Sequence, residues 1–201
     1  MSDILGKGDA YYRTWLKRLK PLISFCYPTE ISGLENIPDG PMIVCANHSN
    51  FIDPVLIGEA FGPEHHIHFM AKQELLTKPV LGKFIENLGS FGVERDSSTD
   101  ITAIRTAMKC IKAGDKVMIF PEGTRVEEDG MASAKSGAVR LAAKLKVPIL
   151  PVYISRNKKI FRKARLIVGE PIPVPTGSHE FYEEFAEQLM QRIAELGKES
   201  A

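Results

Sequence analysis

The stretch PMIVCANHSNFIDP, residues 41–54, carries the signals of a strand, a turn and a helix in succession. The apolar run PMIVCA has the length and composition of a short buried strand. Asp53-Pro54 has the pattern that begins a helix, with Asp as N-cap and Pro at the first helical position. We expect that helix to cover Val55 to about Phe61. A buried strand that leads directly into a helix is the repeating unit of an α/β fold.

His48 and Asp53 stand five positions apart within this stretch. On one regular helix their side chains would point about 140° apart, because each residue turns the chain by about 100°. A turn between the strand and the helix can instead fold the carboxylate back onto one imidazole nitrogen, which leaves the other nitrogen as a base. The alternative is that Asp53 only caps the helix and His48 is a loop residue. The spacing alone leaves both interpretations open.

The rest of the chain continues the alternation of strands and helices. Further strands are expected at residues 66–71, 90–95, 115–120, 147–154 and 164–174, and further helices at residues 98–114, 133–146 and 178–197. Runs rich in Val and Ile that alternate with helices predict an α/β fold, with a mostly parallel central sheet and helices on both faces. Sites in such sheets form at the carboxyl ends of the strands, where the segments NHSNFID and PEGTR are both expected to lie.

The segment from Tyr11 to Tyr27, YYRTWLKRLKPLISFCY, combines aromatic and aliphatic residues with basic ones and contains no acid. It predicts a basic amphipathic N-terminal helical segment that lies on an anionic membrane, with Pro21 breaking or kinking the helix. The alternative is an ordinary helix that packs its apolar stripe on the domain. We expect residues 1–28 to form the membrane-docking segment and residues 29–201 a single α/β domain. Because no apolar run approaches the roughly 18 residues of a spanning helix, we predict no transmembrane helix and a peripheral position on the cytoplasmic face.

The composition excludes several classes of protein. With 201 residues, of which 44% are hydrophobic, the chain can bury the core of one domain, and a net charge of +1 argues against a nucleic-acid binder. Cys26, Cys45 and Cys110 show no pairing or metal-ligand spacing, as in a reducing cytosol. Cys45 lies inside the apolar strand and is interpreted as a packing residue rather than a nucleophile. No G-x-S-x-G elbow is present, which argues against a serine hydrolase.

The cluster HHIH places His65, His66 and His68 close together in the sequence. Alternation along a strand would put His66 and His68 on one face. No carboxylate or cysteine completes a recognisable ligand set around them. We therefore interpret the cluster as a feature of the surface or of an edge strand and expect no metal site.

Four segments together resemble the glycerolipid acyltransferase family, the lysophosphatidic acid acyltransferases. The family carries the blocks N-H-x4-D, G-x-x-x-[IV]-[DE]-R, F-P-E-G-[TS]-R and V-P-[IV]-x-P. The matching segments of this chain, in the same order and at similar spacing, are Asn47–Asp53, Gly89–Arg95, Phe120–Arg125 and Val147–Pro151. Each block is weak evidence alone, but four in order are specific, and the resemblance covers roughly residues 30–175.

The resemblance implies that the chain moves a fatty acyl group from an acyl thioester to the free hydroxyl of lysophosphatidic acid, giving phosphatidic acid for phospholipid biosynthesis. The donor would be an acyl-CoA or an acyl-carrier protein, a co-substrate in a reaction that needs no cofactor. His48 would be the base that takes the hydroxyl proton, and Asp53 would orient it. Alternatives are the same chemistry on another lysophospholipid or on glycerol 3-phosphate, a non-catalytic lipid- or carrier-binding protein, and a metal-dependent phosphoesterase.

The resemblance also implies an acceptor site that binds a phosphate. Glu122, Gly123, Thr124 and Arg125 would line it, and Arg95 would lie nearby. The guanidinium of Arg125 is suited to a phosphate group, whereas Glu122 would orient Arg125 or hold a glycerol hydroxyl.

Lys72, in the segment MAKQEL, is a further candidate for substrate binding. The alternative for this residue is an ordinary surface lysine.

Overall fold

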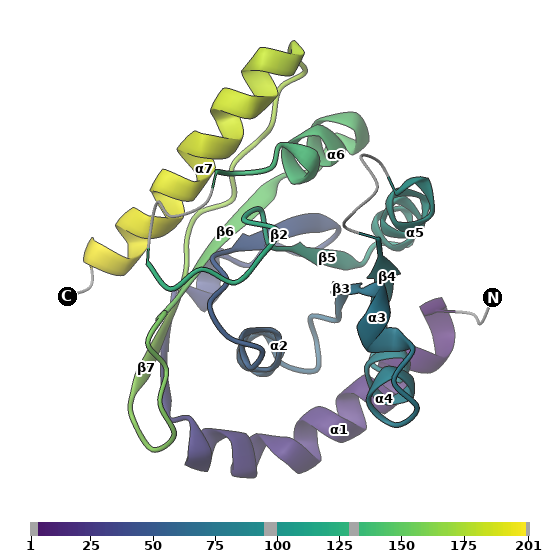
Figure 1. Ribbon diagram of the computed structural model, residues 1–201, viewed down its shortest axis with the longest axis vertical. Coiled ribbons are helices and arrows are strands. Elements are labelled where there is room, and N and C mark those ends of the chain that lie inside the picture. The colour runs from purple at the N-terminus through teal and green to yellow at the C-terminus, as the bar shows by residue number, and fades with distance from the viewer. Residues whose placement is uncertain (1–3, 95–99, 129–132, 200–201) are drawn as a thin grey trace.

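A seven-stranded sheet forms the centre of the protein (Figure 1). The computed structural model describes residues 4–94, 100–128 and 133–199, and within these ranges the strand order is β1-β7-β6-β2-β5-β3-β4. Neighbouring strands are parallel, except that β6 and β7 are antiparallel. The strands are β1 (Thr29–Ser32), β2 (Met42–Ala46), β3 (Ile67–Lys72), β4 (Phe91–Val93), β5 (Lys116–Ile119), β6 (Ile149–Ile154) and β7 (Ala164–Val168). The predicted mostly parallel sheet is confirmed.

Helices cover both faces of the sheet, as the sequence predicts. Figure 1 shows α5, α6 and α7 on one side and α1 and α2 on the other. The α-helices are α1 (Ile4–Cys26), α2 (Asp53–Phe61), α3 (Gln73–Leu76), α4 (Leu81–Asn87), α5 (Ile101–Lys112), α6 (Gly137–Leu145) and α7 (His179–Glu199), and a short 3-10 helix, η1, spans Leu34–Asn36.

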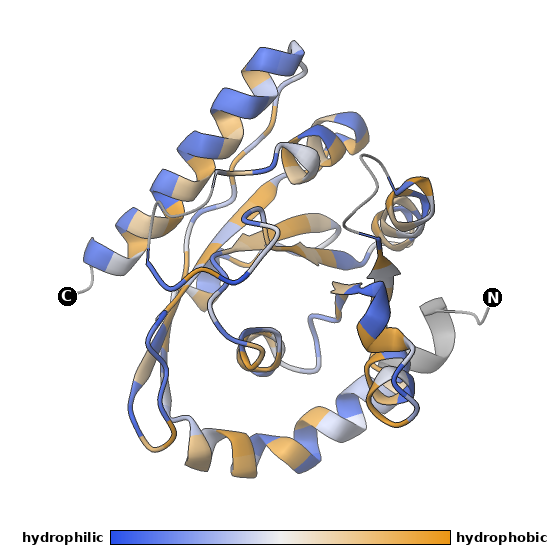
Figure 2. Cartoon of the chain, viewed as in Figure 1, coloured by the Kyte–Doolittle hydropathy of each residue, from blue (hydrophilic) through white to orange (hydrophobic). Residues whose placement is uncertain are grey.

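The central strand β2 divides the core into two layers. Ile43 and Cys45 pack in one cluster with α5, α6 and α7, whereas Met42, Val44 and Ala46 pack in the other with α2. This division follows from the alternation of side chains along a strand. All five residues are completely buried, as expected of a strand that is covered on both faces. The long helix α7 is amphipathic, with alternating apolar and polar bands in Figure 2.

The structure contains the elements that the sequence predicts around the site, together with some that the sequence did not predict. Helix α5 begins after Asp100, whose side chain caps the helix by accepting a hydrogen bond of 2.9 Å from the Ala103 N–H. The strand β1 and the short helices α3 and α4 were not expected. In β1 three of the four residues are exposed, which leaves no apolar alternation to detect.

Two expectations are wrong. Helix α1 continues through Pro21 to Cys26, and Pro21 itself is exposed, so of the predicted break or kink the break does not occur. His68 is completely buried in β3, a strand that lies between β5 and β4, rather than at the surface or on an edge strand. Its two ring nitrogens lie 2.9 Å from the Gly89 carbonyl oxygen and 3.1 Å from Asp115 Oδ2, and these contacts compensate for its burial.

No helix in the described ranges is both long and apolar enough to cross a bilayer.

Candidate functional site

The turn that follows β2 brings His48 and Asp53 together. His48 Nδ1 lies 3.0 Å from Asp53 Oδ2, and the same oxygen accepts 2.8 Å hydrogen bonds from the N–H groups of Ser49 and Asn50. Asp53 is the first residue of α2 rather than its N-cap, and the carboxylate points back into the turn. The interpretation of Asp53 as only a helix cap is therefore wrong, and the turn holds the pair in place.

The other Asp53 oxygen faces a lysine from the distant hairpin between β6 and β7. Lys158 Nζ lies 2.6 Å from Asp53 Oδ1, and both side chains are completely buried. Within the described residues Oδ1 has no well-directed hydrogen bond, so its contact with the ammonium group is an ion pair. Lys158 also donates a 3.0 Å hydrogen bond to Ser49 Oγ, which ties the hairpin to the turn.

The charges of this cluster favour an ionised Asp53. Burial acts to raise the pKa of Asp53, but the hydrogen bond from His48 and the charge of Lys158 outweigh it and hold that pKa below its usual value. Burial also lowers the pKa of Lys158, although the Asp53 carboxylate opposes that shift. An ionised carboxylate beside Nδ1 can stabilise an imidazolium when His48 takes up a proton.

Glu122, in the loop after β5, fixes the backbone of the His48 turn. Its Oε2 accepts a 2.7 Å hydrogen bond from the His48 N–H, and its Oε1 pairs with the Arg156 guanidinium. Arg156 in turn donates a 2.8 Å bond to the Val126 carbonyl oxygen. Glu122 is 4% exposed. The expectation that Glu122 orients Arg125 is wrong, because its oxygens are occupied by the His48 backbone and Arg156.

Asn47 connects the same turn to the neighbouring strand β6. Its side-chain amide donates a 2.8 Å bond to the Ile154 carbonyl oxygen and accepts a 2.9 Å bond from the Ile154 N–H. These contacts extend the pairing of β2 and β6 by one side chain. The position of His48 is therefore fixed from both neighbours of β2, since β6 holds Asn47 and the loop after β5 holds the His48 backbone.

The second ring nitrogen of His48 remains available for chemistry. Within the described part of the chain Nε2 makes no hydrogen bond, and the side chain is 10% exposed. The imidazole stacks on Phe120, with ring centroids 4.1 Å apart and planes 20° apart. Because Nδ1 faces a carboxylate, it carries the ring proton in the neutral form, which leaves the lone pair on Nε2.

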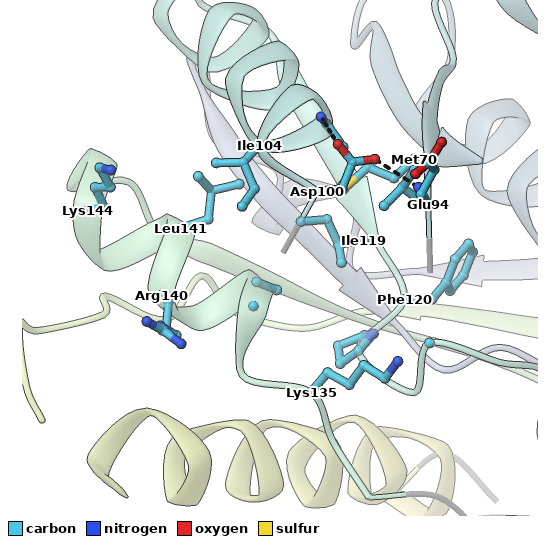
Figure 3. A pocket seen from close by; sticks show the side chains of 16 residues that line it. Met70, Glu94, Asp100, Ile104, Ile119, Phe120, Lys135, Arg140, Leu141 and Lys144 are labelled. Atoms are coloured by element: carbon cyan, nitrogen blue, oxygen red, sulfur yellow. Dashed lines mark hydrogen bonds between the residues drawn. The ribbon is translucent and has the colours of Figure 1, made fainter. Parts of the chain in front are cut away.

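Phe120 also lines a cavity of about 540 Å³ beside the candidate base. Figure 3 shows side chains from β3 and β5, from α5 and α6 and from the loop after β5 around it. The apolar part of the wall includes Met70, Ile104, Ile119 and Leu141. The charged residues that line the cavity are Lys135, Arg140, Lys144, Glu94 and Asp100. The cavity thus combines an apolar interior with polar groups, as small-molecule sites commonly do.

The remaining predicted residues have different surroundings. Thr124 and Arg125 are exposed on the loop after β5, and no hydrogen bond or ion pair engages the Arg125 side chain among the described residues. Gly123, with φ +66°, occupies the left-handed region that favours glycine. Lys72, at the end of β3, forms a 2.7 Å ion pair with Glu74, and its side chain is 41% exposed, as in a surface lysine. Arg95 lies outside the described residues.

Cys45 packs as a small apolar residue in β2. It is completely buried, and burial raises the pKa of its thiol. Because the thiolate is the reactive form, this environment does not activate a nucleophile.

Lys158 and Arg156 belong to the site but were not predicted from the sequence. They stand in the polar segment SRNKK, which has the composition of an exposed turn. Each contacts a carboxylate from a distant part of the chain, Asp53 and Glu122 respectively. Their two-residue spacing would put both on one face of a strand, but residues 155–159 form a bend rather than a strand, so no local pattern indicates these contacts.

Comparison with known proteins identifies relatives of this chain. The family described as Acyltransferase matches residues 28–155. A 1-acyl-sn-glycerol-3-phosphate acyltransferase of Bacillus subtilis (strain 168) is 33% identical over 195 residues, which are 92% of this chain and 96% of the relative. The chloroplastic enzyme BAT2 of Brassica napus, which has the same description, is 31% identical over 67% of this chain, and the match spans 39% of that longer protein.

A solved structure has a similar fold. The crystal structure of the 1-acyl-sn-glycerophosphate (LPA) acyltransferase PlsC from Thermotoga maritima matches with a TM-score of 0.67 and 27% sequence identity. The match covers 92% of this chain and 79% of that one.

Proposed function

The chain belongs to the acyltransferase family, and from that premise we propose that it acylates the free hydroxyl of lysophosphatidic acid, giving phosphatidic acid. The acyl donor is a thioester of CoA or of an acyl-carrier protein, and the reaction needs no further cofactor. The observation that carries the proposal is a buried His–Asp pair whose imidazole stacks on Phe120, a residue that also lines a largely apolar cavity.

In this mechanism His48 Nε2 takes the proton of the acceptor hydroxyl while the hydroxyl oxygen attacks the thioester carbonyl carbon. The developing imidazolium keeps its Nδ1–H bond to Asp53, which is ionised and holds the ring direction. The tetrahedral intermediate then collapses, the C–S bond breaks, and the proton passes from Nε2 to the departing thiolate. No enzyme nucleophile takes part, in agreement with the burial of Cys45.

Lys158 supports this step as a positioning residue. Its ammonium group holds Asp53 Oδ1, so that Oδ2 stays directed at His48 and the turn N–H groups. Its charge also offsets part of the negative charge of Asp53, which keeps the carboxylate from binding the imidazolium too tightly to release its proton.

The cavity beside Phe120 suits the acyl chain of the donor. Its wall is largely apolar, so it replaces water around a hydrocarbon chain, and Phe120 links that wall to the His48 ring. We place the thioester carbonyl near Nε2 and the chain between α5 and α6. The volume of this cavity would then limit the length of the chain that is transferred.

We assign the binding of the acceptor phosphate to the guanidinium of Arg125. It is exposed on the loop whose Glu122 holds the His48 backbone, and a guanidinium binds phosphate through two parallel hydrogen bonds. Thr124 and Gly123 complete this loop. Glu122 acts on the acceptor site through the turn that it holds.

Acyl transfer by the purified protein tests the proposal. With lysophosphatidic acid in detergent, and palmitoyl-CoA or the acyl-carrier-protein thioester in separate assays, we expect phosphatidic acid from at least one donor. Arg125→Ala should raise KM for lysophosphatidic acid about tenfold with a smaller change in kcat, because it removes a charged hydrogen-bond donor. Arg192→Ala, an exposed arginine on α7, is the matched control.

Other outcomes identify the alternatives. Turnover only with a different lysophospholipid or with glycerol 3-phosphate would replace the acceptor and keep the chemistry. Chelator-sensitive release of inorganic phosphate would indicate a phosphoesterase instead. Lipid binding without turnover with any of these acceptors and either donor would contradict the enzymatic proposal.

A further inference from the structure

Four large apolar side chains are exposed where helix α1 ends. Leu22 and Phe25, in the last turns of α1, are 60% and 70% exposed. Ile160 and Phe161, at the tip of the hairpin between β6 and β7, are 57% and 62% exposed. The rings of Phe25 and Phe161 contact each other, with centroids 5.4 Å apart. Single exposed apolar residues are ordinary, but a group of them marks an interaction surface. We call these four residues the apolar patch.

Backbone hydrogen bonds hold the two parts of the apolar patch together. The Phe161 N–H donates a 2.7 Å bond to the Cys26 carbonyl oxygen, and the Ala164 N–H donates a 2.9 Å bond to that of Pro28. In Figure 1 the tip of the β6–β7 hairpin lies beside the end of α1. Phe161 has φ +64°, a backbone conformation that is rare and costly for a bulky residue. Its ring is exposed, so burial of the side chain does not offset that cost. The fold thus presents an aromatic side chain to the outside.

The two segments that carry the apolar patch are rich in basic residues and contain no acidic ones. Residues 13–29 contain four Lys or Arg, residues 155–169 contain six, and neither range contains Asp or Glu. The whole chain has 26 basic and 25 acidic residues, so positive charge is concentrated in these ranges. Seven of the basic residues in these ranges are exposed, Arg13 among them, and we call the six nearer the apolar patch in sequence the basic rim: Lys17, Arg18, Lys20, Lys159, Arg162 and Lys163.

Earlier described side chains of α1 pack on the domain instead. Tyr12 is 3% exposed and donates a 3.2 Å hydrogen bond to the Gly58 carbonyl oxygen in α2. Trp15 packs edge-to-face on Phe84 of α4, with ring centroids 5.0 Å apart. The apolar stripe expected to lie on a membrane is therefore largely used for packing. Among the side chains of α1 that the structure describes, the exposed large apolar ones lie in the last turns, beside the β6–β7 hairpin.

We propose that the apolar patch inserts into the headgroup boundary of an anionic phospholipid bilayer, while the basic rim contacts the lipid phosphates. A bilayer fits this combination because it offers hydrocarbon and negative charge together across a broad surface. Long Lys and Arg side chains can reach the phosphates while aromatic and aliphatic side chains enter the boundary.

The role of this docking in the reaction rests on the proposed function, in which the acceptor is a lipid. The hairpin that carries Ile160 and Phe161 also carries Arg156 and Lys158, which contact Glu122 and Asp53. Docking at this hairpin would bring the membrane close to the turn that contains His48. An acceptor lipid could then reach the base without passing through bulk water.

Vesicle flotation without substrate tests the docking surface. The full chain should float with phosphatidylcholine vesicles that contain phosphatidylglycerol, bind vesicles of pure phosphatidylcholine more weakly, and dissociate as NaCl is raised. The double variant Phe25→Ser, Phe161→Ser should partition roughly tenfold more weakly, because two exposed rings no longer enter the bilayer. Ile101→Ser is the matched control, since Ile101 is 57% exposed at the start of α5.

The triple variant Lys159→Gln, Arg162→Gln, Lys163→Gln tests the basic rim separately. It should lose most of the preference for phosphatidylglycerol and most of the salt dependence, with an unchanged thermal unfolding curve. All of these residues are exposed, so the variants are expected to fold, and circular dichroism checks this.

Several results would overturn the inference. The first is an absence of vesicle binding by the native chain. The second is equal vesicle binding by the Phe25→Ser, Phe161→Ser variant and by the Ile101→Ser control. The third is a Phe25→Ser, Phe161→Ser variant that binds vesicles as the native chain does but loses affinity for an acyl-carrier protein or for a second copy of the chain. Turnover in detergent is measured independently and should survive in all of the docking variants. Vesicle binding by a protein without turnover would therefore refute the proposed function and leave the docking surface supported.

Discussion

The structure contains two buried histidines that each contact an aspartate, and the two pairs differ in their surroundings. His48 Nδ1 lies 3.0 Å from Asp53, and His68 Nε2 lies 3.1 Å from Asp115. The second nitrogen of His48 has no hydrogen bond among the described residues, whereas that of His68 lies 2.9 Å from the Gly89 carbonyl oxygen. The His48 side chain is 10% exposed and the His68 side chain is not exposed at all.

This difference separates a group that can exchange protons from one that only holds the fold together. Both His68 nitrogens face acceptors, so both donate and the ring is an imidazolium. Burial acts to lower the pKa of His68, but the hydrogen bond to Asp115 outweighs it and raises that pKa to about 10. His68 thereby connects β3 to Gly89 and Asp115. A His–Asp contact is therefore not sufficient for base catalysis, because the second nitrogen must also be free to meet a substrate.

The largest expected effect comes from removing one histidine of each pair. His48→Ala should lower kcat for acyl transfer about a thousandfold, which is within the usual range for a general base. His68→Gln should leave kcat close to that of the native chain and lower thermal stability instead. Steady-state kinetics in detergent, with thermal unfolding of the same samples, provide both readouts. Equal loss of kcat in the two variants would contradict the distinction between the pairs.

A smaller effect is expected from replacing Lys158, whose ammonium group contacts Asp53 directly. Lys158→Met should lower kcat roughly ten- to a hundredfold, because the carboxylate loses the contact that fixes its direction. The acid limb of the pH–rate profile should also move to higher pH, since an Asp53 charge that is no longer offset favours the protonated imidazole.

Lys159→Met, in the adjacent exposed lysine, is the control for this experiment and should change neither rate nor profile in detergent. If Lys158→Met lowers stability but leaves the acid limb in place, Lys158 is a structural residue only. Partial recovery of the profile in Lys158→Arg would support the role of the charge.

The local parts of this site could be predicted from the sequence, and the long-range parts could not. The strand β2 and the helix α2 follow from one apolar run and from Asp53-Pro54, and four ordered blocks indicated the family. Lys158 was missed because its value depends on a contact with Asp53, 105 positions earlier in the chain, which no local pattern contains. The burial of His68 was missed for the same reason, since a polar run predicts exposure unless its distant partner is known.

The smallest expected effect is the pH dependence of the His68–Asp115 pair. The pKa of His68 is about 10 in the folded chain and about 6.5 in an unfolded one, so folding favours the protonated ring. The resulting stabilisation is complete below about pH 6.5 and is lost as pH rises towards 10. At pH 6 we expect His68→Gln to lower the free energy of unfolding by about 2 kcal/mol, as for a hydrogen bond to a charged group. Urea unfolding at pH 6, 8 and 10 should show this difference shrinking. A difference that stays constant across these pH values would mean that His68 is neutral in the fold, and the contrast with His48 would then rest on the occupied nitrogen alone.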